Sequence, residues 1–295
     1  MLPVLVQVVV SGLLLSGVYA LVSIGLTLIF GVSRVSNFAQ GEFVTLGMYA
    51  TYWLFVLMGI DPYLSLILIV PSFFLLGIII ARVIIKPIIG APPIAQIFAT
   101  IGMSLVIQNV ALFFWGGNFR TIKTSYSETI IRLQWLNLPL VHLVAFGVAM
   151  GVIFLLFLFL KYTYLGKAIR AVAQDRQAAS LMSINVGLLD LITFGIGIAC
   201  AGIAGTILIP LYPVYPTIGF PLALIAFVVV VLGGLGSMTG ALVGGLVIGL
   251  LETFTGFYMG SALRQIVYFI VFILVLIIKP SGFFGQRGSE EIGFK

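Results

Sequence analysis

Long apolar runs alternate with short polar clusters along the whole chain of 295 residues. Asp, Glu, Lys and Arg are all absent from residues 1–33, 43–60, 62–81, 87–119, 133–160, 191–251 and 265–278. A charged side chain is costly in the hydrocarbon core of a bilayer, and a helix needs about 20 apolar residues to cross it. The charge-free runs therefore predict membrane-spanning helices.

The run from 191 to 251 is too long for one helix. Prolines at positions 210, 213, 216 and 221, followed by glycines at 233, 234 and 236, divide it into three spans. The chain is thus predicted to be an all-α integral membrane protein, a polytopic bundle of about 8–10 transmembrane helices with at least one broken or short span. Nine spans are expected near Leu2–Gly31, Gly41–Met58, Tyr63–Ile85, Ile94–Trp115, Leu140–Leu160, Leu189–Leu211, Thr217–Leu232, Thr239–Phe254 and Ala262–Ile278.

Composition supports this class and narrows the chemistry. Hydrophobic residues make up 62% of the chain and charged residues 7%, whereas about 25% of the residues in a soluble domain are charged. This excludes a soluble enzyme, and the sparse charges argue against binding of nucleic acid. The single cysteine, Cys200, cannot form an internal disulfide, and the single histidine, His142, cannot build a His-based metal site.

Basic residues predict the orientation, because they collect in cytoplasmic loops. The segment 161–176 carries four basic residues and one acidic residue, so we place it inside the cell. Counting spans from there puts ten of the fourteen basic residues inside, and it makes the C-terminus cytoplasmic and the N-terminus external. The six further basic residues placed inside are Arg34, Arg82, Lys86, Lys279, Arg287 and Lys295, and those left outside are Arg120, Lys123, Arg132 and Arg264.

The segment 161–187 is the most informative polar stretch. Its core, 166–179, consists of good helix formers without proline, which predicts one short helix outside the bilayer. That helix could dock in a groove of a partner, with charged residues at the rim, or it could be a basic connector lying on anionic lipid. Composition leaves both interpretations open. The candidate docking residues are Arg170, Ala171, Gln174, Asp175, Arg176, Ala178 and Ala179.

Small residues recur four positions apart in two later spans. Such spacing lets helix backbones approach closely. Helix packing inside the subunit is favoured over a role in lining a channel, and packing against a partner subunit is a further interpretation. The positions are Gly197, Ala201 and Gly205 in the first series and Gly236, Gly240 and Gly244 in the second.

A few polar residues fall in or beside the predicted spans. Asn37 and Gln40 precede a flexible glycine between the first two spans. They could belong to a broken helix end that lines a pathway, or to an interfacial turn, which is the simpler interpretation. Gln108 and Asn109 are costly in lipid and are expected to face the bundle interior, against substrate or another helix.

Acidic residues in the later spans receive structural interpretations. Asp190 is expected to cap a helix, and Glu252 to snorkel or to pair with Arg264. Without an acid at mid-membrane, a stand-alone ion-coupled carrier is disfavoured. The chain also lacks a phosphate-binding loop, so any ATP that drives it must bind to another chain.

Several segments that follow one another along the chain form a distinctive combination. They include Gly17–Leu21, Gly25–Gly31, Asn37–Ala39, Ala99–Ser104, Gln108–Asn109, Gly166–Ala171, Ala201–Gly205, Pro210–Tyr212 and Val231–Ser237. Together, and in this order, these segments resemble the permeases of branched-chain amino-acid ABC importers, and the first of the two permease subunits in particular. Two positions depart from the family pattern: Gln40 stands where histidine is common, and Ser183 stands where glycine is common.

The resemblance implies a single transmembrane permease domain over residues 1–295, with a cytoplasmic coupling-helix loop at 161–187. The partners it implies are a second permease subunit, two cytoplasmic ATPases that bind ATP and magnesium, an extracytoplasmic substrate-binding protein and the lipid of the cell membrane. The chain would then carry branched-chain amino acids inward, and Ala171–Ala179 would dock on an ATPase. A permease for urea or another amide or amino acid is the alternative within this architecture.

Overall fold

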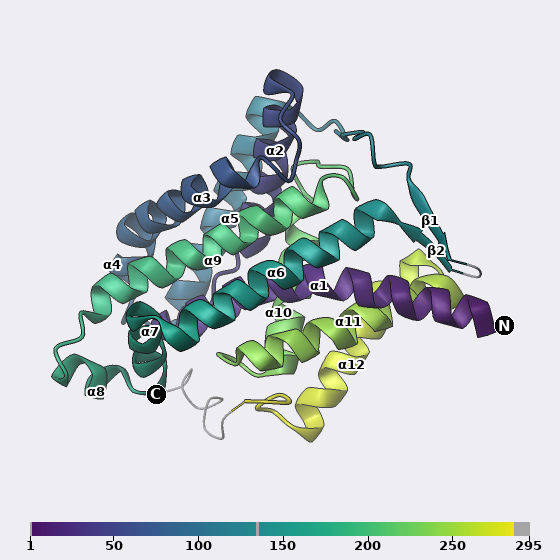
Figure 1. Cartoon of the computed structure of the whole chain (residues 1–295). Coiled ribbons are helices and arrows are strands. Elements are labelled where there is room, and N and C mark those ends of the chain that lie inside the picture. Colours follow the sequence, from purple (N-terminus) through teal and green to yellow (C-terminus); the bar gives the residue numbers. More distant parts are fainter. Residues whose placement is uncertain (1, 134–135, 286–295) are drawn as a thin grey trace.

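The computed structural model describes residues 2–133 and 136–285 (Figure 1). Its helices confirm the predicted fold class, a polytopic helical membrane protein. Seven helices are long and apolar enough to cross a membrane, and two shorter apolar helices, α10 and α12, complete the set among the described residues. The elements are α1 (Leu2–Ser33), α2 (Gln40–Met58), α3 (Leu66–Ile80), η1 (Ala81–Ile85), α4 (Lys86–Ile88), α5 (Pro93–Trp115), β1 (Ile130–Leu133), β2 (Leu136–Pro139), α6 (Leu140–Tyr162), α7 (Tyr164–Gln174), α8 (Arg176–Leu181), α9 (Val186–Leu208), α10 (Gly219–Gly233), α11 (Met238–Tyr258), η2 (Ser261–Leu263) and α12 (Arg264–Ile278).

Helices α1 and α9 form the centre of the bundle and are buried along most of their length. Helix α1 packs against α6, α9, α10 and α11, while α9 also packs against α2 and α3. The surrounding helices expose large apolar side chains outward, as helices in a bilayer do because lipid is itself apolar.

Small residues set the distances between the central helices. A side chain added at Gly245 would meet the backbone of Ala20 at 2.9 Å, and one at Gly205 would meet the carbonyl of Val44 at a still shorter distance. Real Cβ contacts are longer than this, so the pairs α1–α11 and α2–α9 can approach as they do only because these positions carry no side chain.

Two helices begin inside the bundle. The Gln40 side-chain amide donates to the carbonyl of Gly197, 3.1 Å away, and Gly197 lies about 16 Å along α9 from its first residue. Beside it, α10 begins against Gly41, where an added Cβ would meet the Gly219 carbonyl, and Phe38 stacks on Phe227 with ring centroids 4.7 Å apart. The segments 34–39 and 209–218 therefore re-enter the bundle from its two ends.

The ends of the bundle differ in their loops (Figure 1). Helices α7 and α8 mark one end, here called the α7 end, and the antiparallel β1–β2 pair marks the other, the hairpin end. At the α7 end the Arg34 guanidinium donates to the carbonyl of Ala173, which places the end of α1 against α7. Arg287 and Lys295, which we expect inside the cell, lie outside the described residues.

Candidate functional site

The segment α7–α8 projects from the bundle at the α7 end (Figure 1). Helix α7 is capped by Thr163, whose hydroxyl accepts a hydrogen bond from the Gly166 amide at 3.0 Å. The single helix expected over 166–179 is instead two helices, so that expectation was wrong. The chain is extended at Asp175, and the Asp175 carboxylate accepts from the amides of Gln177 and Ala178 at 2.9 Å each. An aspartate that caps a new helix in this way competes with continuation of the old one.

A tight left-handed turn ends α8. The Ile184 amide donates to the carbonyl of Ala179 and the Ser183 amide to that of Ser180, which is the Schellman pattern. Ser183 carries the left-handed conformation, with φ of +61°. Serine therefore adopts here the conformation that the glycine of the resembling family would adopt with less strain.

An ion pair fastens α8 to the bundle. Arg176 and the buried Asp190 form a two-pronged pair, with Nη1 2.9 Å from Oδ1. The same Nη1 donates to the carbonyl of Val32, and the Ser33 hydroxyl donates to Asp190. Arg176, expected at the rim of a partner's groove, thus pairs within the chain and joins α8 to the ends of α1 and α9.

Asp190 was expected to cap a helix, and this expectation is also wrong. The cap of α9 is Asn185, whose side-chain oxygen accepts from the Leu188 amide at 3.0 Å. Asp190 lies one turn further on, where its carboxylate holds Arg176.

The outer surface of α8 is exposed in the part of the chain that the structure describes. Leu181 and Met182 are 85% and 77% exposed, and Gln177 and Ala178 are exposed beside them. We call these four residues the α8 tip. Two large apolar side chains at a projecting polar loop are typical of a protein contact surface.

The other candidate docking residues divide between this surface and the bundle. Ala179 is buried and Ala171 half-buried, while Arg170, Gln174 and Asp175 are exposed. The α7 residues that face the bundle are Ala168, Ile169 and Val172.

The four polar residues considered for a pathway fall into two separate pairs. Asn37 and Gln40 are buried and bonded to each other at 3.2 Å. On α5, Gln108 is half-buried, and Asn109 is exposed and donates to the Leu105 carbonyl of its own helix. Among the described residues no hydrogen bond joins the two pairs. Asn109 therefore faces away from this chain's interior, contrary to expectation.

Glu42 is an interior acid that the sequence did not reveal. It is 1% exposed, its Oε1 accepts a 3.4 Å hydrogen bond from Ser104, and its Oε2 has no partner among the described residues. It packs against Gly219, the first residue of α10. In the sequence, Glu42 follows Gly41, where a turn at the membrane boundary is expected. The segment 34–39 instead re-enters the bundle and brings Glu42 into its interior. The expectation that no acidic residue lies in the middle of the membrane region was therefore wrong.

Glu252 is also buried, on α11. It accepts a 2.7 Å hydrogen bond from the Tyr19 hydroxyl on α1, and Arg264 lies 3.8 Å away on α12. The carboxylate therefore ties three helices together, and it pairs with Arg264 while buried instead of snorkelling to the surface.

The candidate packing residues all contact segments of this same chain. Gly197 lies against Gly25 and Ile29, and Ala201 is fully buried. The remaining contacts are Gly205 with Val44 and Met48, Gly236 with Gly31, Gly240 with Gly233, and Gly244 with Val229.

Two contacts hold the segment between α5 and β1 at the hairpin end. Arg120 pairs through its backbone with Val214, and the Tyr126 hydroxyl donates to the Asp61 carboxylate at 2.8 Å. Burial, together with that hydrogen bond, raises the pKa of Tyr126 well above its ordinary value, so the hydroxyl remains a donor at neutral pH.

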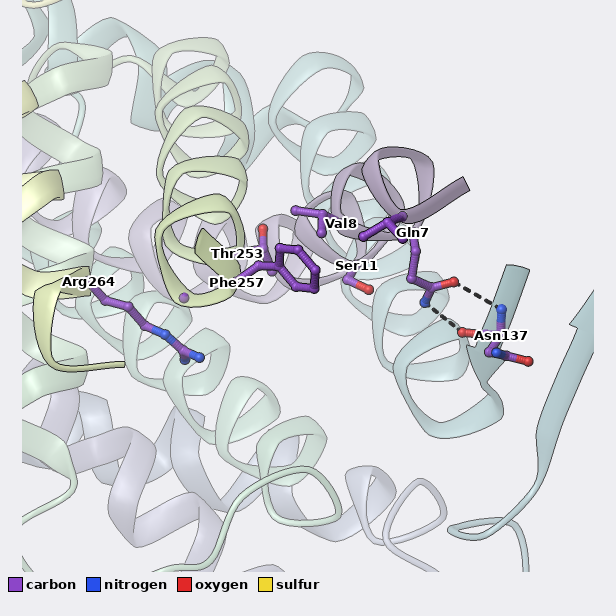
Figure 2. A pocket seen from close by; sticks show the side chains of 9 residues that line it. Gln7, Val8, Ser11, Asn137, Thr253, Phe257 and Arg264 are labelled. Atoms are coloured by element: carbon purple, nitrogen blue, oxygen red, sulfur yellow. Dashed lines mark hydrogen bonds between the residues drawn. The ribbon is translucent and has the colours of Figure 1, made fainter. Parts of the chain in front are cut away.

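A cavity of about 470 Å³ opens at the hairpin end between α1, α11, α12 and β2. Figure 2 shows Arg264 on one side and the Gln7–Asn137 pair on the other. Gln7 and the backbone of Asn137 exchange hydrogen bonds of 2.7 and 3.0 Å, while Val8 and Phe257 supply an apolar wall. A few polar groups in an apolar cavity are typical of a small-molecule site.

Comparison with known proteins identifies what the chain is similar to. Residues 8–276 match the family model described as the branched-chain amino acid transport system permease component. The high-affinity branched-chain amino acid transport system permease proteins LivH of Salmonella typhimurium and BraD of Pseudomonas aeruginosa are each 32% identical to it, over 97% of both chains. The ribose import permease protein RbsC of Escherichia coli is 26% identical over 65% of this chain and 62% of its own. No solved structure matches.

Proposed function

Because the chain belongs to the branched-chain amino acid transport system permease family, we propose that it carries branched-chain amino acids into the cell, driven by ATP hydrolysis on partner ATPases that dock at the α8 tip. The observation that carries this proposal is similarity to LivH and BraD over nearly the entire chain. The family is one of transport permeases, which is not an enzyme class.

The α7 end faces the cytoplasm in this proposal. Basic residues concentrate at cytoplasmic loops, and α6, α7 and the start of α8 contribute Lys161, Lys167, Arg170 and Arg176 there. The hairpin end would then meet the extracytoplasmic substrate-binding protein.

Movement of the ATPases reaches the bundle through the Arg176–Asp190 pair. Burial of Leu181 and Met182 in an ATPase groove would hold α8, and the ion pair joins α8 to the inner ends of α1 and α9. Closure of the ATPase pair would therefore shift the two central helices, which biases the permease between its outward-facing and inward-facing states.

The second permease would cover the exposed face of α5. Asn109 is exposed in the second half of a membrane-spanning helix, where an uncovered polar side chain is costly in lipid. Gln108 lies half-buried beside it. We place the substrate pathway along this face, and the buried pair Asn37–Gln40 supports α2 behind it.

Reconstitution tests the proposal. The tagged chain is extracted in mild detergent, its bound proteins are identified by mass spectrometry, and the recovered chains are placed in vesicles for uptake of labelled leucine. We expect ATPases and a second permease, and uptake that requires ATP. Competition by isoleucine but not by urea would support the substrate class, and competition by urea alone would favour the amide alternative.

Variants of the α8 tip and of the α8 cap test the docking site. Leu181→Asp and Ala178→Trp change the tip itself and should leave membrane insertion intact while lowering uptake per ATP hydrolysed. Asp175→Lys should have the same effect on uptake, but it acts through loss of the cap that holds the first turn of α8. Leu181→Met, which keeps an apolar side chain, is the matched control. Full coupled uptake with all three changes would show that the ATPases dock elsewhere.

A proton-coupled carrier is the second candidate, because Glu42 is an acid buried among membrane helices. It predicts uptake by the chain alone that follows a proton gradient, ignores ATP and is abolished by Glu42→Gln. The importer proposal predicts no uptake without the partner chains.

A further inference from the structure

A second cavity, of about 370 Å³, lies at the α7 end between α1, α6, α7 and the start of α11. Buried apolar residues form its walls, among them Leu28, Leu160 and Ile169. Lys161 and Arg170 also line it, and because both are exposed they mark the side on which it opens.

Neither cation has an acidic partner within residues 2–133 and 136–285. The Lys161 ammonium lies over the rings of Phe157 and Tyr162, 5.7 and 5.3 Å from their centroids. Arg170 donates to the Lys161 carbonyl, 3.4 Å away. No Asp or Glu of the described residues lines this cavity or forms a salt bridge with either side chain. The described part of the chain therefore leaves these two neighbouring positive charges without a counter-ion.

The beginning of α11 adds to the positive potential. Met238 and Thr239, the first two residues of this 21-residue helix, line the same cavity. A helix N-terminus carries a partial positive charge, so helix and side chains favour the same ligand charge.

Apolar stripes lead from the cavity into the membrane region. On α6, Phe157, Phe154 and Met150 follow Lys161 at helical spacing and are 44%, 61% and 37% exposed. On α11, Val243 and Leu246 follow Thr239 and are 38% and 42% exposed. Helices α6 and α11 flank α1 (Figure 1), so both stripes start at the same opening.

We propose that this cavity binds the phosphate of an anionic phospholipid through Lys161 and Arg170, with the acyl chains lying along α6 and α11. An amino acid or a free phosphate would use the cations but not the long stripes. The inference rests on the orientation in the proposed function, because the cytoplasmic leaflet supplies anionic lipid. The lipid would brace α7 against the bundle.

Native mass spectrometry of the complete importer complex tests the site. Protein stripped of lipid is titrated with phosphatidylglycerol, with phosphatidylethanolamine and, separately, with inorganic phosphate. We expect phosphatidylglycerol to be retained on the wild type and its affinity to fall about 30-fold in the double variant K161Q/R170Q, since each of the two cations contributes about fivefold to the attraction of anionic lipid. The double variant K123Q/R132Q removes the same charge at the hairpin end and should bind as the wild type does.

A second variant keeps the test independent of the two cations. Thr239→Trp fills the opening without changing charge and should also displace phosphatidylglycerol. The proposal is overturned if both variants retain the lipid, if phosphatidylethanolamine binds equally well, or if inorganic phosphate displaces the lipid at equal concentration. Because the readout is lipid binding, it stands apart from uptake: failed uptake with intact lipid binding would count against the proposed function alone.

Discussion

Replacing Arg176 by methionine should loosen the coupling segment from the bundle. Methionine retains most of the side-chain length but removes the bonds to Asp190 and to the Val32 carbonyl. The buried Asp190 carboxylate would keep, among the described residues, only the Ser33 hydroxyl as a side-chain donor.

The magnitude follows from burial of the two partners. Removing one partner of a fully buried pair costs about 3–5 kcal/mol. The Arg176 side chain is 36% exposed and Asp190 only 7%, so water screens part of the interaction and we expect about 2–3 kcal/mol. The additional change Asp190→Asn removes the stranded charge and should restore most of the loss. The midpoint of thermal unfolding should then fall by roughly 5 °C in the single variant.

A double-mutant cycle measures this coupling. Thermal unfolding in detergent is compared for the wild type, Arg176→Met, Asp190→Asn and the double variant, and hydrogen exchange reports the amides of α8. Effects of the two changes that simply add would refute the interaction, and unchanged exchange in α8 would refute its role as the anchor of this helix. Reconstituted Arg176→Met should also hydrolyse more ATP per leucine carried.

Three further predictions concern the turn at Ser183, the close approach at Gly41 and the helix cap at Asp175. Ser183→Gly should stabilise the protein by about 0.5 kcal/mol, because relief of the left-handed conformation exceeds the entropy of the freer unfolded chain; a lower unfolding midpoint would contradict this. Gly41→Ala should destabilise the protein by about 3 kcal/mol or more, because the added Cβ would meet the Gly219 carbonyl. Gly102→Ala should be neutral or stabilising, because nothing lies within 4 Å of its added Cβ. Equal yields of folded protein for the two variants would refute the close approach of Gly41 to Gly219. Asp175→Ala should destabilise α8 by about 1 kcal/mol and Asp175→Asn much less, and equal hydrogen exchange of the first α8 amides in the two variants would argue against the cap.

The charge-free runs were enough to predict the membrane helices. Each of the seven long helices and two shorter apolar helices of the described chain overlaps the span expected for it, because the cost of a charge in lipid is a property of the sequence alone. The cap at Asp175 was missed although aspartate is a common cap residue. The residues around it are good helix formers, and propensity alone does not show where a side chain will compete with the helix backbone.

The depth of each polar group in the bundle, and the partner of each charged group, could be found only from the tertiary structure. Glu42 follows a glycine turn in the sequence, which by itself indicates the membrane boundary. In the structure that turn lies beside Gly197, so the Glu42 carboxylate is buried in the bundle interior. Likewise, Arg176 is paired because Asp190, fourteen residues beyond it, folds back to the start of α8. Lys161 has no such acidic partner among the described residues. The sequence by itself determined which segments enter the membrane, through the local cost of exposing charge to lipid. Only packing between distant helices decided how deep each polar group lies and which charges are neutralised within the chain.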